Sequence, residues 1–352
     1  MARYHQALEA LQQAAARTRA GVVCLPVPLA PAEGLGWADR FGLAAARHKA
    51  LVLAQHLRLV RRALPHLRAG HPVLVREFST IPLLMVAPAL VRWRSRLLFV
   101  VNHNLQWALN QRPEAWAFRR LERLGFRFVF FETLAAPALH AWGFDINRHA
   151  VLRFPAIEST NTARSASQSN RRFIGFVGHF RAEKGMIEAL DVLFRHPPVR
   201  DRLAVGVPNP QAFLRARGAG REFIQSLQLF NTASDADFRA FLAQCAVVVL
   251  NYSVRDYAWR PSGLLADCAA AGTPVVIPDL PVQREQLRWP TPIGEVFQDL
   301  DALPDTVSRA LAKGSSGGYD FAAYRSARGI KATAMALDEI WKPSGNRSNA
   351  DL

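Results

Sequence analysis

The sequence predicts an α/β protein of two domains, each built on a parallel sheet covered by helices. Short apolar segments alternate with helical segments along the chain, a pattern typical of parallel sheets. A polar stretch at residues 158–170 (ESTNTARSASQSN) interrupts the alternation once and has the composition of a linker. The length of 352 residues fits two average domains, and the 50% hydrophobic content suffices for their cores.

In the first half, each element is predicted from the spacing of its apolar residues. The chain opens on a helix, whereas a domain of this kind normally opens on a strand, so either the first strand is absent or the start of the chain is placed late. Pro113 stands near the start of its helix, where its missing N–H costs no hydrogen bond. The predicted helices are 5–20, 44–67, 83–91, 113–124 and 135–142, and the predicted strands are 22–27, 72–75, 97–101, 127–131 and 150–154.

After the linker the same alternation restarts. The polar tail that follows Lys342 is predicted to be disordered. The predicted strands are 173–177, 203–207, 246–250 and 274–277, and the predicted helices are 186–194, 235–244, 264–271, 301–312 and 321–341. The chain is therefore divided into a first domain (1–156), a linker (157–171), a second domain (172–318), a closing helix (319–342) and a tail (343–352).

The most informative segment is residues 260–274 (RPSGLLADCAAAGTP). Here Pro-Ser-Gly begins a helix of small residues, and Gly272 ends that helix before a strand. A helix N-terminus presents unpaired N–H groups and partial positive charge. Ser262 and Gly263 would let an anion approach this end closely, and Arg260 adds a full charge beside it. The segment is therefore predicted to bind phosphate.

A second cationic turn follows the strand 173–177, in the sequence GHFRAEKG that begins at Gly178. The glycine lets the backbone approach a ligand, and Arg181 and Lys184 lie where a strand-to-helix turn meets the crevice at the strand C-termini. A solvated turn is the alternative. Combined with the helix start, the two cations would surround a diphosphate through charge-assisted bonds worth about 1.5–3 kcal/mol each. The spacing is neither that of a Walker loop nor that of the Rossmann glycine fingerprint.

The positive charge is concentrated in the first half. Residues 1–156 hold 21 Lys+Arg and 8 Asp+Glu, and the remainder holds 23 and 20, which gives net charges of +13 and +3. This asymmetry points to an anionic membrane surface, an anionic or lipid-phosphate acceptor, or nucleic acid, with a merely solvated basic face as the alternative. Nucleic acid is disfavoured because its binding motifs are missing. The helix 44–67, basic on one face, is the candidate membrane contact.

The sequence also indicates in which cellular compartment the protein is found. Three scattered cysteines, without metal or disulfide spacing, suit a reducing environment. The N-terminus carries no signal pattern, and the longest apolar stretch, residues 81–91, contains two prolines and is too short for a bilayer. We expect a cytoplasmic protein, either soluble or peripheral at the inner face of the cell membrane.

The residues from Phe173 to Gly185, followed by 260–274, resemble the donor domain of GT-B glycosyltransferases of the family-four type. The resemblance is good from about Arg172 to Ala312 and weaker before it. It implies two facing Rossmann-like domains, with a nucleotide-sugar on the C-terminal one and the acceptor on the N-terminal one. The helix 321–341 resembles the closing helix of that family, which crosses back to the first domain.

The resemblance also implies roles for individual residues. Arg181 and Lys184 would bind the donor diphosphate and stabilise the leaving group, while Ser262 and Gly263 would donate backbone N–H groups. Asp267 falls at the second glutamate of the family's paired motif, which holds the ribose; a solvent-facing polar residue is the alternative. The base would be read by backbone near residue 230. The other donor-side residues are Gly178, Phe230, Asn231, Tyr257 and Arg260.

One residue departs from the family pattern. The first glutamate of the motif would fall at Trp259, which leaves Asp256 or Tyr257 as substitutes. The order Tyr-x-x-Arg-x-Ser-Gly, residues 257–263, resembles a bacterial branch of these enzymes that lacks this glutamate. The contacts to the donor sugar are therefore left open.

Three residues of the first domain are candidates for the acceptor side. His103 ends the strand 97–101, where the family often has a catalytic histidine near the donor sugar; a structural histidine is the alternative. Asn104, with Asn102, would hydrogen-bond sugar hydroxyls. Glu77 follows the strand 72–75 and would act as a base if the enzyme inverts configuration. If it retains configuration, the leaving diphosphate takes the proton.

Together these observations predict a glycosyltransferase that moves a sugar from a nucleotide-diphosphate-sugar donor to a saccharide or lipid-linked acceptor, with retention. Protein cations would replace a metal at the diphosphate, so no obligatory metal or cofactor is expected. One alternative is a nucleotide-sugar epimerase on the same architecture. Another is a catalytically degenerate member that binds a partner or scaffolds other enzymes.

Overall fold

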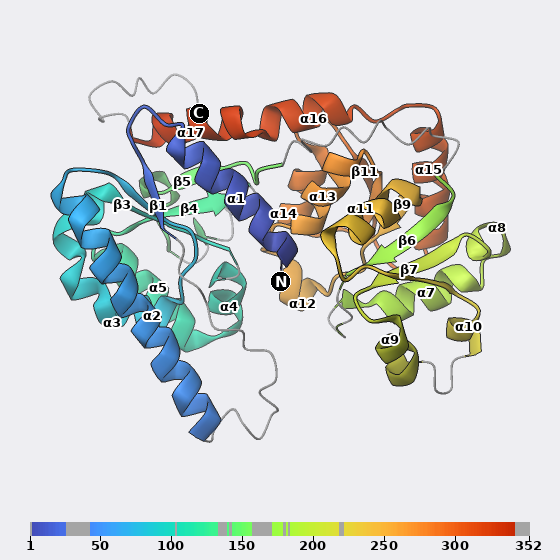
Figure 1. Cartoon of the computed structure of the whole chain (residues 1–352), viewed down its shortest axis with the longest axis horizontal. Helices are drawn as coiled ribbons and strands as arrows, with labels where there is room; N and C mark the ends of the chain where they lie inside the picture. Colours follow the sequence, from blue (N-terminus) through green and yellow to red (C-terminus); the bar gives the residue numbers. More distant parts are fainter. Residues whose placement is uncertain are drawn as a thin grey trace. The chain divides into compact units, whose positions relative to one another are not determined.

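The computed structural model describes residues 2–25, 43–102, 104–132, 139–140, 143–156, 171–178, 181, 184–217 and 222–341. The chain divides into two compact units (Figure 1). Unit 1 comprises residues 1–7 and 154–329, and unit 2 comprises residues 8–153 and 330–352. Residues 157–170 of the predicted linker and the predicted tail lie outside the described residues.

Unit 2 contains a parallel sheet of five strands whose order in space follows their order in the chain. Because parallel crossovers are right-handed, this sequential order places every connecting helix on the same face of the sheet. Figure 1 shows α2, α3 and α5 on that side, with α1 and α17 on the other. The strands are β1 (Val23–Leu25), β2 (Val73–Val75), β3 (Leu97–Val100), β4 (Arg127–Phe131) and β5 (Ala150–Leu152). The helices are α1 (Ala2–Ala16), which belongs to this unit from Leu8 onward, α2 (Leu43–Arg68), α3 (Thr80–Val86), α4 (Asn104–Asn110), α5 (Arg112–Arg123) and α17 (Ile330–Trp341), with 3-10 turns η2 (Ala87–Ala89), η3 (Val91–Arg96) and η4 (Ile146–Arg148).

The core of unit 2 is built largely from phenylalanine rings that come from the strands, from α5, from the loop after β2 and from the segment before η4. The centroids of Phe118 and Phe128 lie 4.6 Å apart, and Phe78 meets Phe99 edge-on at 5.5 Å. Phe144 packs on Phe118 at 5.2 Å. All five rings are buried. Aromatic pairs of this kind contribute about 0.5–1.5 kcal/mol beyond the area that they bury, so α5 is fixed firmly to its sheet.

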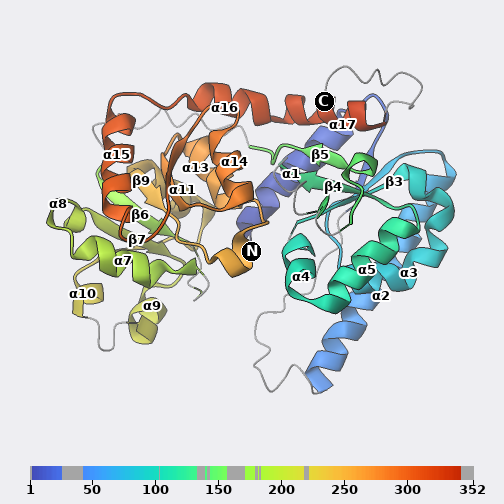
Figure 2. The ribbon, with the colours of Figure 1, turned by 180° about the vertical axis from the view of Figure 1, so that it is seen from behind.

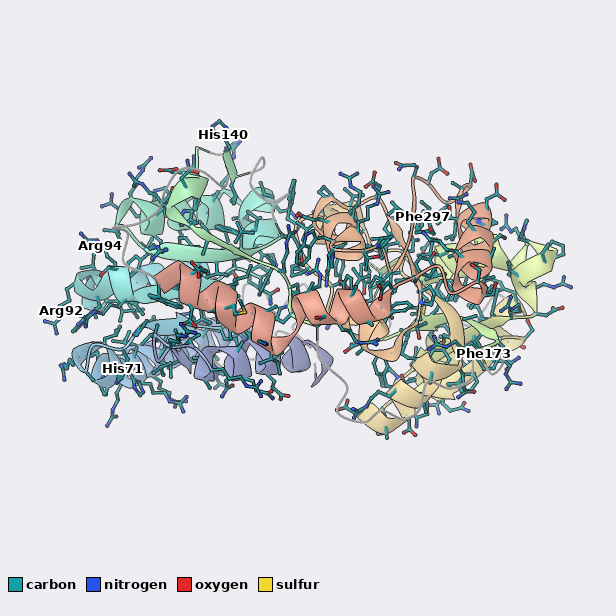
Figure 3. All side chains as sticks on the ribbon, turned by 90° about the horizontal axis from the view of Figure 1, so that it is seen from above. His71, Arg92, Arg94, His140, Phe173 and Phe297 are labelled. Carbon is teal, nitrogen blue, oxygen red and sulfur yellow. The ribbon has the colours of Figure 1, made fainter. Side chains whose placement is uncertain are left out.

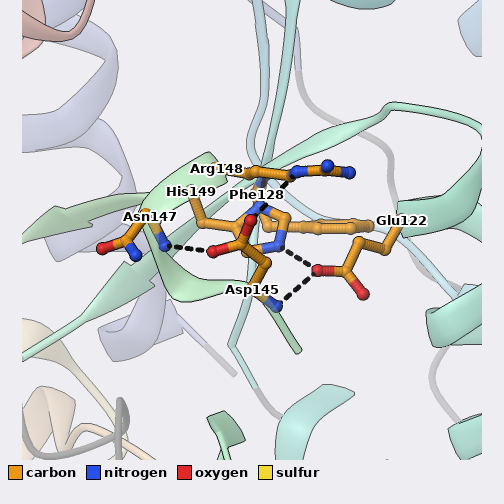
Figure 4. A network of polar contacts seen from close by, with 6 residues as sticks. All are labelled: Glu122, Phe128, Asp145, Asn147, Arg148 and His149. Carbon is orange, nitrogen blue, oxygen red and sulfur yellow. Dashed lines mark hydrogen bonds and ion pairs between the residues drawn. The ribbon is translucent and has the colours of Figure 1, made fainter. Parts of the chain in front are cut away.

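A buried polar network closes the N-terminal edge of β4 and β5 (Figure 4). Glu122 Oε1 accepts a hydrogen bond from the Asp145 N–H at 2.9 Å and lies 3.2 Å from His149 Nε2. His149 Nδ1 accepts from the Phe128 N–H at 3.3 Å, so the proton of the neutral ring is on Nε2. Burial lowers the pKa of His149 to about 4. This network lies at the sheet edge opposite the strand C-termini, and its role is structural.

We expect acid to destabilise unit 2 through His149. Its pKa is about 4 when folded and 6.5 as the reference value, so the unfolded chain binds the proton more tightly. The free energy of unfolding is therefore unaffected by His149 protonation above pH 6.5. It falls by roughly 3 kcal/mol as the pH drops to about 4. Urea unfolding of the wild type and of His149→Gln at pH 7, 5.5 and 4.5 measures this loss. The stability difference between the two proteins should shrink with acid, and a constant difference would contradict the assignment.

Unit 1 contains a parallel sheet of six strands in the order β11-β10-β9-β6-β7-β8. The chain begins at β6, moves outward to β8, and then returns to the other side of β6 with β9. The strand order therefore reverses between β6 and β9, and ligands of open α/β sheets bind at such a switch point. The strands are β6 (Phe173–Val177), β7 (Leu203–Val207), β8 (Gln228–Asn231), β9 (Cys245–Val249), β10 (Val275–Pro278) and β11 (Gly294–Phe297).

Helices cover both faces of this second sheet. Buried apolar side chains of α7 and α15 form one core with it, and those of α11, α13 and α14 form the other. The main helices are α7 (Met186–Phe194), α11 (Asp235–Gln244), α13 (Gly263–Ala271), α14 (Pro281–Arg288), α15 (Leu303–Ser315) and α16 (Phe321–Arg328). The shorter ones are α8 (Pro197–Arg200), α9 (Pro210–Arg217), α10 (Glu222–Gln225) and α12 (Val254–Tyr257).

The predicted single helix 321–341 is wrong. The structure has two helices, α16 and α17, separated by Gly329 in an extended conformation (φ −70°, ψ 172°). Just before the break, Arg328 is held in unit 1, where its Nη1 donates to the Phe154 carbonyl and its Nε to the Trp289 carbonyl. The Arg328 carbonyl accepts from the Ala156 N–H. These bonds compete with continuation of the helix, and α17 instead packs against β5 within unit 2.

Candidate active site

The switch point of unit 1 brings the first predicted phosphate-binding turn to the end of β6. Gly178 has φ +114° and donates its N–H to the Gly206 carbonyl at 3.0 Å. A Cβ atom at Gly178 would lie 3.3 Å from Lys184 Nζ, so the ammonium group rests beside this glycine. The Lys184 N–H donates to the Arg181 carbonyl at 3.1 Å, and Arg181 itself is exposed. The turn therefore holds the half-buried Lys184 ammonium beside the glycine backbone at the C-terminal end of β6.

Asn251, which sequence reasoning missed, joins the two loops of the switch point. It follows β9, and its Nδ2 donates to the Gly185 carbonyl at 2.8 Å. Gly185 is left-handed (φ 50°, ψ 24°) and directly precedes α7. Because β6 and β9 are hydrogen-bonded neighbours, this bond fixes the β6–α7 turn to the loop after β9. A polar residue directly after a predicted strand was the available signal.

The second predicted element, the start of α13, has a more constrained geometry than expected. Ser262 caps the helix, with its hydroxyl accepting from the Leu265 N–H at 3.4 Å. Its own N–H donates to Gln286 Oε1 at 2.8 Å, and Gln286 Nε2 donates back to the Ser262 carbonyl at 2.9 Å. The predicted role of the Ser262 N–H as a phosphate donor is therefore corrected. The first-turn N–H groups of Gly263 and Leu264 have no intrahelical acceptor and still point out of the helix end.

Arg260 is positioned by the same helix, α14, through a second glutamine that sequence reasoning also missed. Gln283 Nε2 donates to the Arg260 carbonyl at 3.4 Å. The Arg260 guanidinium lies 5.4 Å from the centre of the Tyr257 ring, and Tyr257 stacks on Tyr252 with centroids 4.4 Å apart. Two glutamines one turn apart thus hold the backbone from Arg260 to Ser262, while an aromatic pair supports the cation.

The far end of α13 is closed by arginines. Arg171 donates from Nη2 to the Ala271 carbonyl and from Nη1 to the Gly272 carbonyl, both at 2.8 Å. Arg325 Nη1 donates to the Ala269 carbonyl at 2.9 Å. Cations at a helix C-terminus complement its dipole. The helix is therefore anchored at its C-terminal end, with its N-terminal end directed to the edge of the sheet.

Asp267 is buried on α13, one turn from its start, with 9% of its surface exposed. The alternative of a solvent-facing polar residue is therefore wrong. The nearby phenol of Tyr252 is also buried, and burial raises its pKa well above the usual range, with further contributions from Tyr257 and Asp267. A buried carboxylate has little access to solvent, so its hydrogen-bond donors must come from the protein or from a ligand.

The predicted base-reading residues lie on β8, two strands away from β6. The Phe230 ring packs on Phe173 at 5.2 Å and on Phe241 at 5.0 Å. Asn231 Oδ1 accepts from the Ala233 N–H at 2.9 Å. Both side chains are thus engaged within the protein, which leaves the backbone as the reading element, and this role stays a prediction.

In unit 2 the three acceptor-side candidates fare differently. Glu77 follows β2 and is half-buried; burial raises its pKa, and Arg76 opposes the shift. Asn104 is buried, with Nδ2 donating to the Phe78 carbonyl at 2.8 Å and Oδ1 accepting from the Asn102 N–H at 3.4 Å. Its predicted contact with sugar hydroxyls is therefore corrected to a structural role. His103 lies outside the described residues.

Across the described ranges, no group of three or more His, Cys, Asp or Glu side chains is placed to hold a metal ion. An Asp-x-Asp sequence does occur at Asp235 and Asp237, in the first turn of α11. Asp237 there accepts from the Ser234 hydroxyl at 2.6 Å, and both residues are exposed at the helix start.

Comparison with known proteins identifies the fold. No family model and no curated protein matches the chain. Solved structures do match: sucrose-phosphate synthase from Thermosynechococcus elongatus has a TM-score of 0.65 at 14% identity, covering 96% of this chain and 91% of that one. HepE of Anabaena in complex with UDP has a TM-score of 0.62 at 12% identity, covering 95% of both chains. The UDP-forming trehalose-phosphate synthase of Burkholderia xenovorans has a TM-score of 0.61 at 13% identity, covering 84% and 79%.

These neighbours define the class of the fold. The chain has the GT-B fold, with two parallel α/β sheets of five and six strands. The predicted fold class is confirmed. At these identities the likeness establishes the fold alone, and the activity is a separate question that depends on the site.

Proposed function

We propose that the protein is a glycosyltransferase that uses a nucleotide-diphosphate-sugar donor. The observation that supports this most is the arrangement at the β6–β9 switch point. The Lys184 ammonium beside Gly178, the Arg260 cation and the open N-terminus of α13 all belong to loops at one edge of one sheet. A diphosphate carries the charge that this combination favours. The neighbour HepE was solved with UDP and with UDP-glucose, which makes UDP the first donor to test.

The proposed reaction retains configuration. The bond between the anomeric carbon and the diphosphate oxygen breaks, and a bond to the acceptor hydroxyl forms on the same face. The acceptor proton passes to the leaving diphosphate. Lys184, Arg181 and Arg260 stabilise the charge that develops on that diphosphate, which is the term that usually contributes most to catalysis. The Gly263 N–H adds a hydrogen bond from the helix end.

Further residues complete the proposed donor site. Asp267 accepts hydrogen bonds from the ribose hydroxyls, and backbone at Phe230 and Asn231 reads the base. Tyr257 supports the Arg260 side chain. On the acceptor side, Glu77 is the candidate base should configuration be inverted; its raised pKa would place its proton uptake closer to neutrality than that of an exposed glutamate. The acceptor is a saccharide or a lipid-linked sugar, and no metal is required because protein cations occupy its place.

A nucleotide screen tests the proposal. A nucleoside diphosphate held at one hundred times its Kd should stabilise the protein by about 2.7 kcal/mol, seen as a rise in Tm. Among UDP, GDP and ADP one should act at the lowest concentration, and its monophosphate should act more weakly because it lacks the second phosphate. Absence of any shift with all three diphosphates would contradict the proposal.

A second measurement separates a transferase from the degenerate binding protein and from the epimerase. Release of the nucleoside diphosphate from its sugar conjugate is followed with and without candidate saccharide acceptors. A transferase releases it faster with an acceptor, a binding protein does not release it, and an epimerase changes the sugar without an acceptor. We propose a cytoplasmic location, with the protein either soluble or peripheral at the inner face of the cell membrane.

A further inference from the structure

Exposed apolar side chains gather on one set of helices in unit 2. Among the described residues, seven large apolar side chains are exposed, and five of them belong to α2, α3 and α5. Each of these helices also carries buried side chains that pack into the core, and the five exposed side chains are not among them. The five are Leu51 (45% exposed), Leu57 (56%), Ile81 (38%), Met85 (61%) and Trp116 (60%).

The topology places these side chains on the same side of the sheet. Strands β1 to β5 follow each other in sequence, so right-handed crossovers carry α2, α3 and α5 over one face. Contacts join α2 to α3 and α3 to α5, and Figures 1 and 2 show the three helices on the same side of the sheet from front and back. The three helices that carry these exposed side chains therefore lie on one face of the sheet.

The segment that forms these helices carries few acidic residues. Residues 43–123 contain 14 Lys+Arg and three acids, of which Glu77 lies at the end of β2, and Glu114 and Glu122 lie on α5, half-buried and buried respectively. On α2, Leu51 stands one turn from Arg47, and Leu57 one turn from Arg61. Residues three or four apart are neighbours on a helix surface, so each of these two leucines has an arginine beside it.

The pattern repeats on α5 and continues at the sheet edge. Trp116 has Arg112 four residues before it and Arg119 and Arg120 three and four residues after it, all exposed. Arg92 and Arg94 of η3 extend the positive charge toward the N-terminal edge of the sheet, where Figure 3 shows them at the same end as His71. Tryptophan and arginine together are typical of the headgroup level of a bilayer.

We propose that this face, formed by α2, α3 and α5, docks on an anionic lipid surface. Aliphatic side chains such as Leu57 and Met85 gain from entering hydrocarbon but gain little from nucleic-acid phosphates, whereas arginine is attracted to anionic headgroups. An interleaved surface fits lipid better than it fits nucleic acid, which would use the cations alone. Docking would bring the enzyme to a lipid-linked acceptor at the membrane. Only this link to the acceptor rests on the proposed function; the docking itself does not.

Vesicle sedimentation with two matched methionines tests the apolar part. Met85 on α3 and Met335 on α17 are 61% and 62% exposed, so Met85→Asp and Met335→Asp introduce the same charge at equal exposure on different helices. At low salt we expect the wild type to bind phosphatidylglycerol–phosphatidylcholine vesicles at least about tenfold more tightly than pure phosphatidylcholine. Met85→Asp should weaken binding about tenfold, and Met335→Asp should leave it unchanged.

Charge reversal tests the basic part. The pair Arg58→Glu and Arg61→Glu on α2 should lower the partition coefficient at least about 30-fold, because each arginine near an anionic surface contributes a factor of about five. The matched pair Arg215→Glu and Arg239→Glu, exposed in unit 1, should have little effect. Equal losses from both pairs, or no preference of the wild type for anionic vesicles, would overturn the proposal.

Two further readouts keep the result unambiguous. Far-UV circular dichroism and urea unfolding show whether each variant is folded. The Tm shift with UDP is measured on every variant, and it should survive in the vesicle-binding mutants; its loss in the wild type as well would count against the proposed function and not against docking. Tight binding to a DNA duplex with none to vesicles would assign the face to nucleic acid and overturn the lipid proposal.

Discussion

Replacing Lys184 by alanine is expected to lower kcat for sugar transfer by a factor of about 10² to 10³. The ammonium rests beside Gly178 at the switch point, where it would offset the charge that develops on the leaving diphosphate. Losses of this size are typical when one preorganised donor to a developing anion is removed. The same variant should lose most of the Tm shift with UDP, since the cation also contributes to ground-state binding. Initial rates of UDP release and Tm with UDP measure both effects.

Lys313→Ala is the matched control for this prediction. Lys313 belongs to the same unit, is about equally accessible, and pairs with Glu295 at 3.4 Å, near the β11 edge. Its removal should cost at most about 1 kcal/mol of stability, as for other exposed pairs, and should leave kcat unchanged. If Lys184→Ala and Lys313→Ala proved equally active and equally responsive to UDP, the assigned site would be wrong.

Gly185→Ala is expected to destabilise unit 1 by about 3 kcal/mol and to abolish nucleotide binding. The residue is left-handed, which costs alanine about 1–2 kcal/mol. In addition, a Cβ atom there would lie 2.5 Å from Asn251 Nδ2 and 2.5 Å from the Asn251 carbonyl oxygen. Relieving such a contact requires a shift of the β9 loop, and overpacking of this kind costs about 1–3 kcal/mol. The shift would also separate the two loops that Asn251 joins.

The control for Gly185→Ala isolates the contact from the backbone strain. Gly317 in the same unit is also left-handed (φ +73°), but no atom lies within 4 Å of a Cβ placed there. Gly317→Ala should therefore cost only about 1–2 kcal/mol and leave the Tm shift with UDP intact. Urea unfolding and the UDP titration distinguish the two variants. A Gly185→Ala protein with wild-type stability and UDP affinity would show that the tie through Asn251 is dispensable.

Much of unit 1 was predictable from local pattern. Four predicted elements coincide with observed ones: the strands 173–177 and 203–207 and the helices 186–194 and 235–244. Their apolar patterns are pronounced, and polar or turn-forming residues mark their ends. The helix predicted at 264–271, with Pro-Ser-Gly at its start, is observed as α13, and Ser262 is its N-cap. The placement of Lys184 after β6 followed from the same reasoning, since a polar turn after a buried strand must lie at the sheet edge.

Other elements carried too weak a local signal. The helix α14 (PVQREQLR) has few apolar residues, so its periodicity does not stand out, and its role emerges only through Gln283 and Gln286. The edge strands β8 and β11 were missed because an edge strand is half-exposed and lacks a continuous apolar run. The break at Gly329 was missed because helical periodicity continues on both sides of it.

The sequence by itself determined the alternation of strands and helices, the positive charge of the first half and the residue types that follow each strand in unit 1. These properties depend on neighbours within a few residues, which is the range over which periodicity and turn chemistry act. Only the tertiary structure decided that β6 and β9 are neighbours, that the Ser262 amide is engaged by Gln286, and that Asp267 is buried. Each of these depends on partners tens of residues away in the chain, and such pairings are set by the packing of the whole sheet, which no local pattern records.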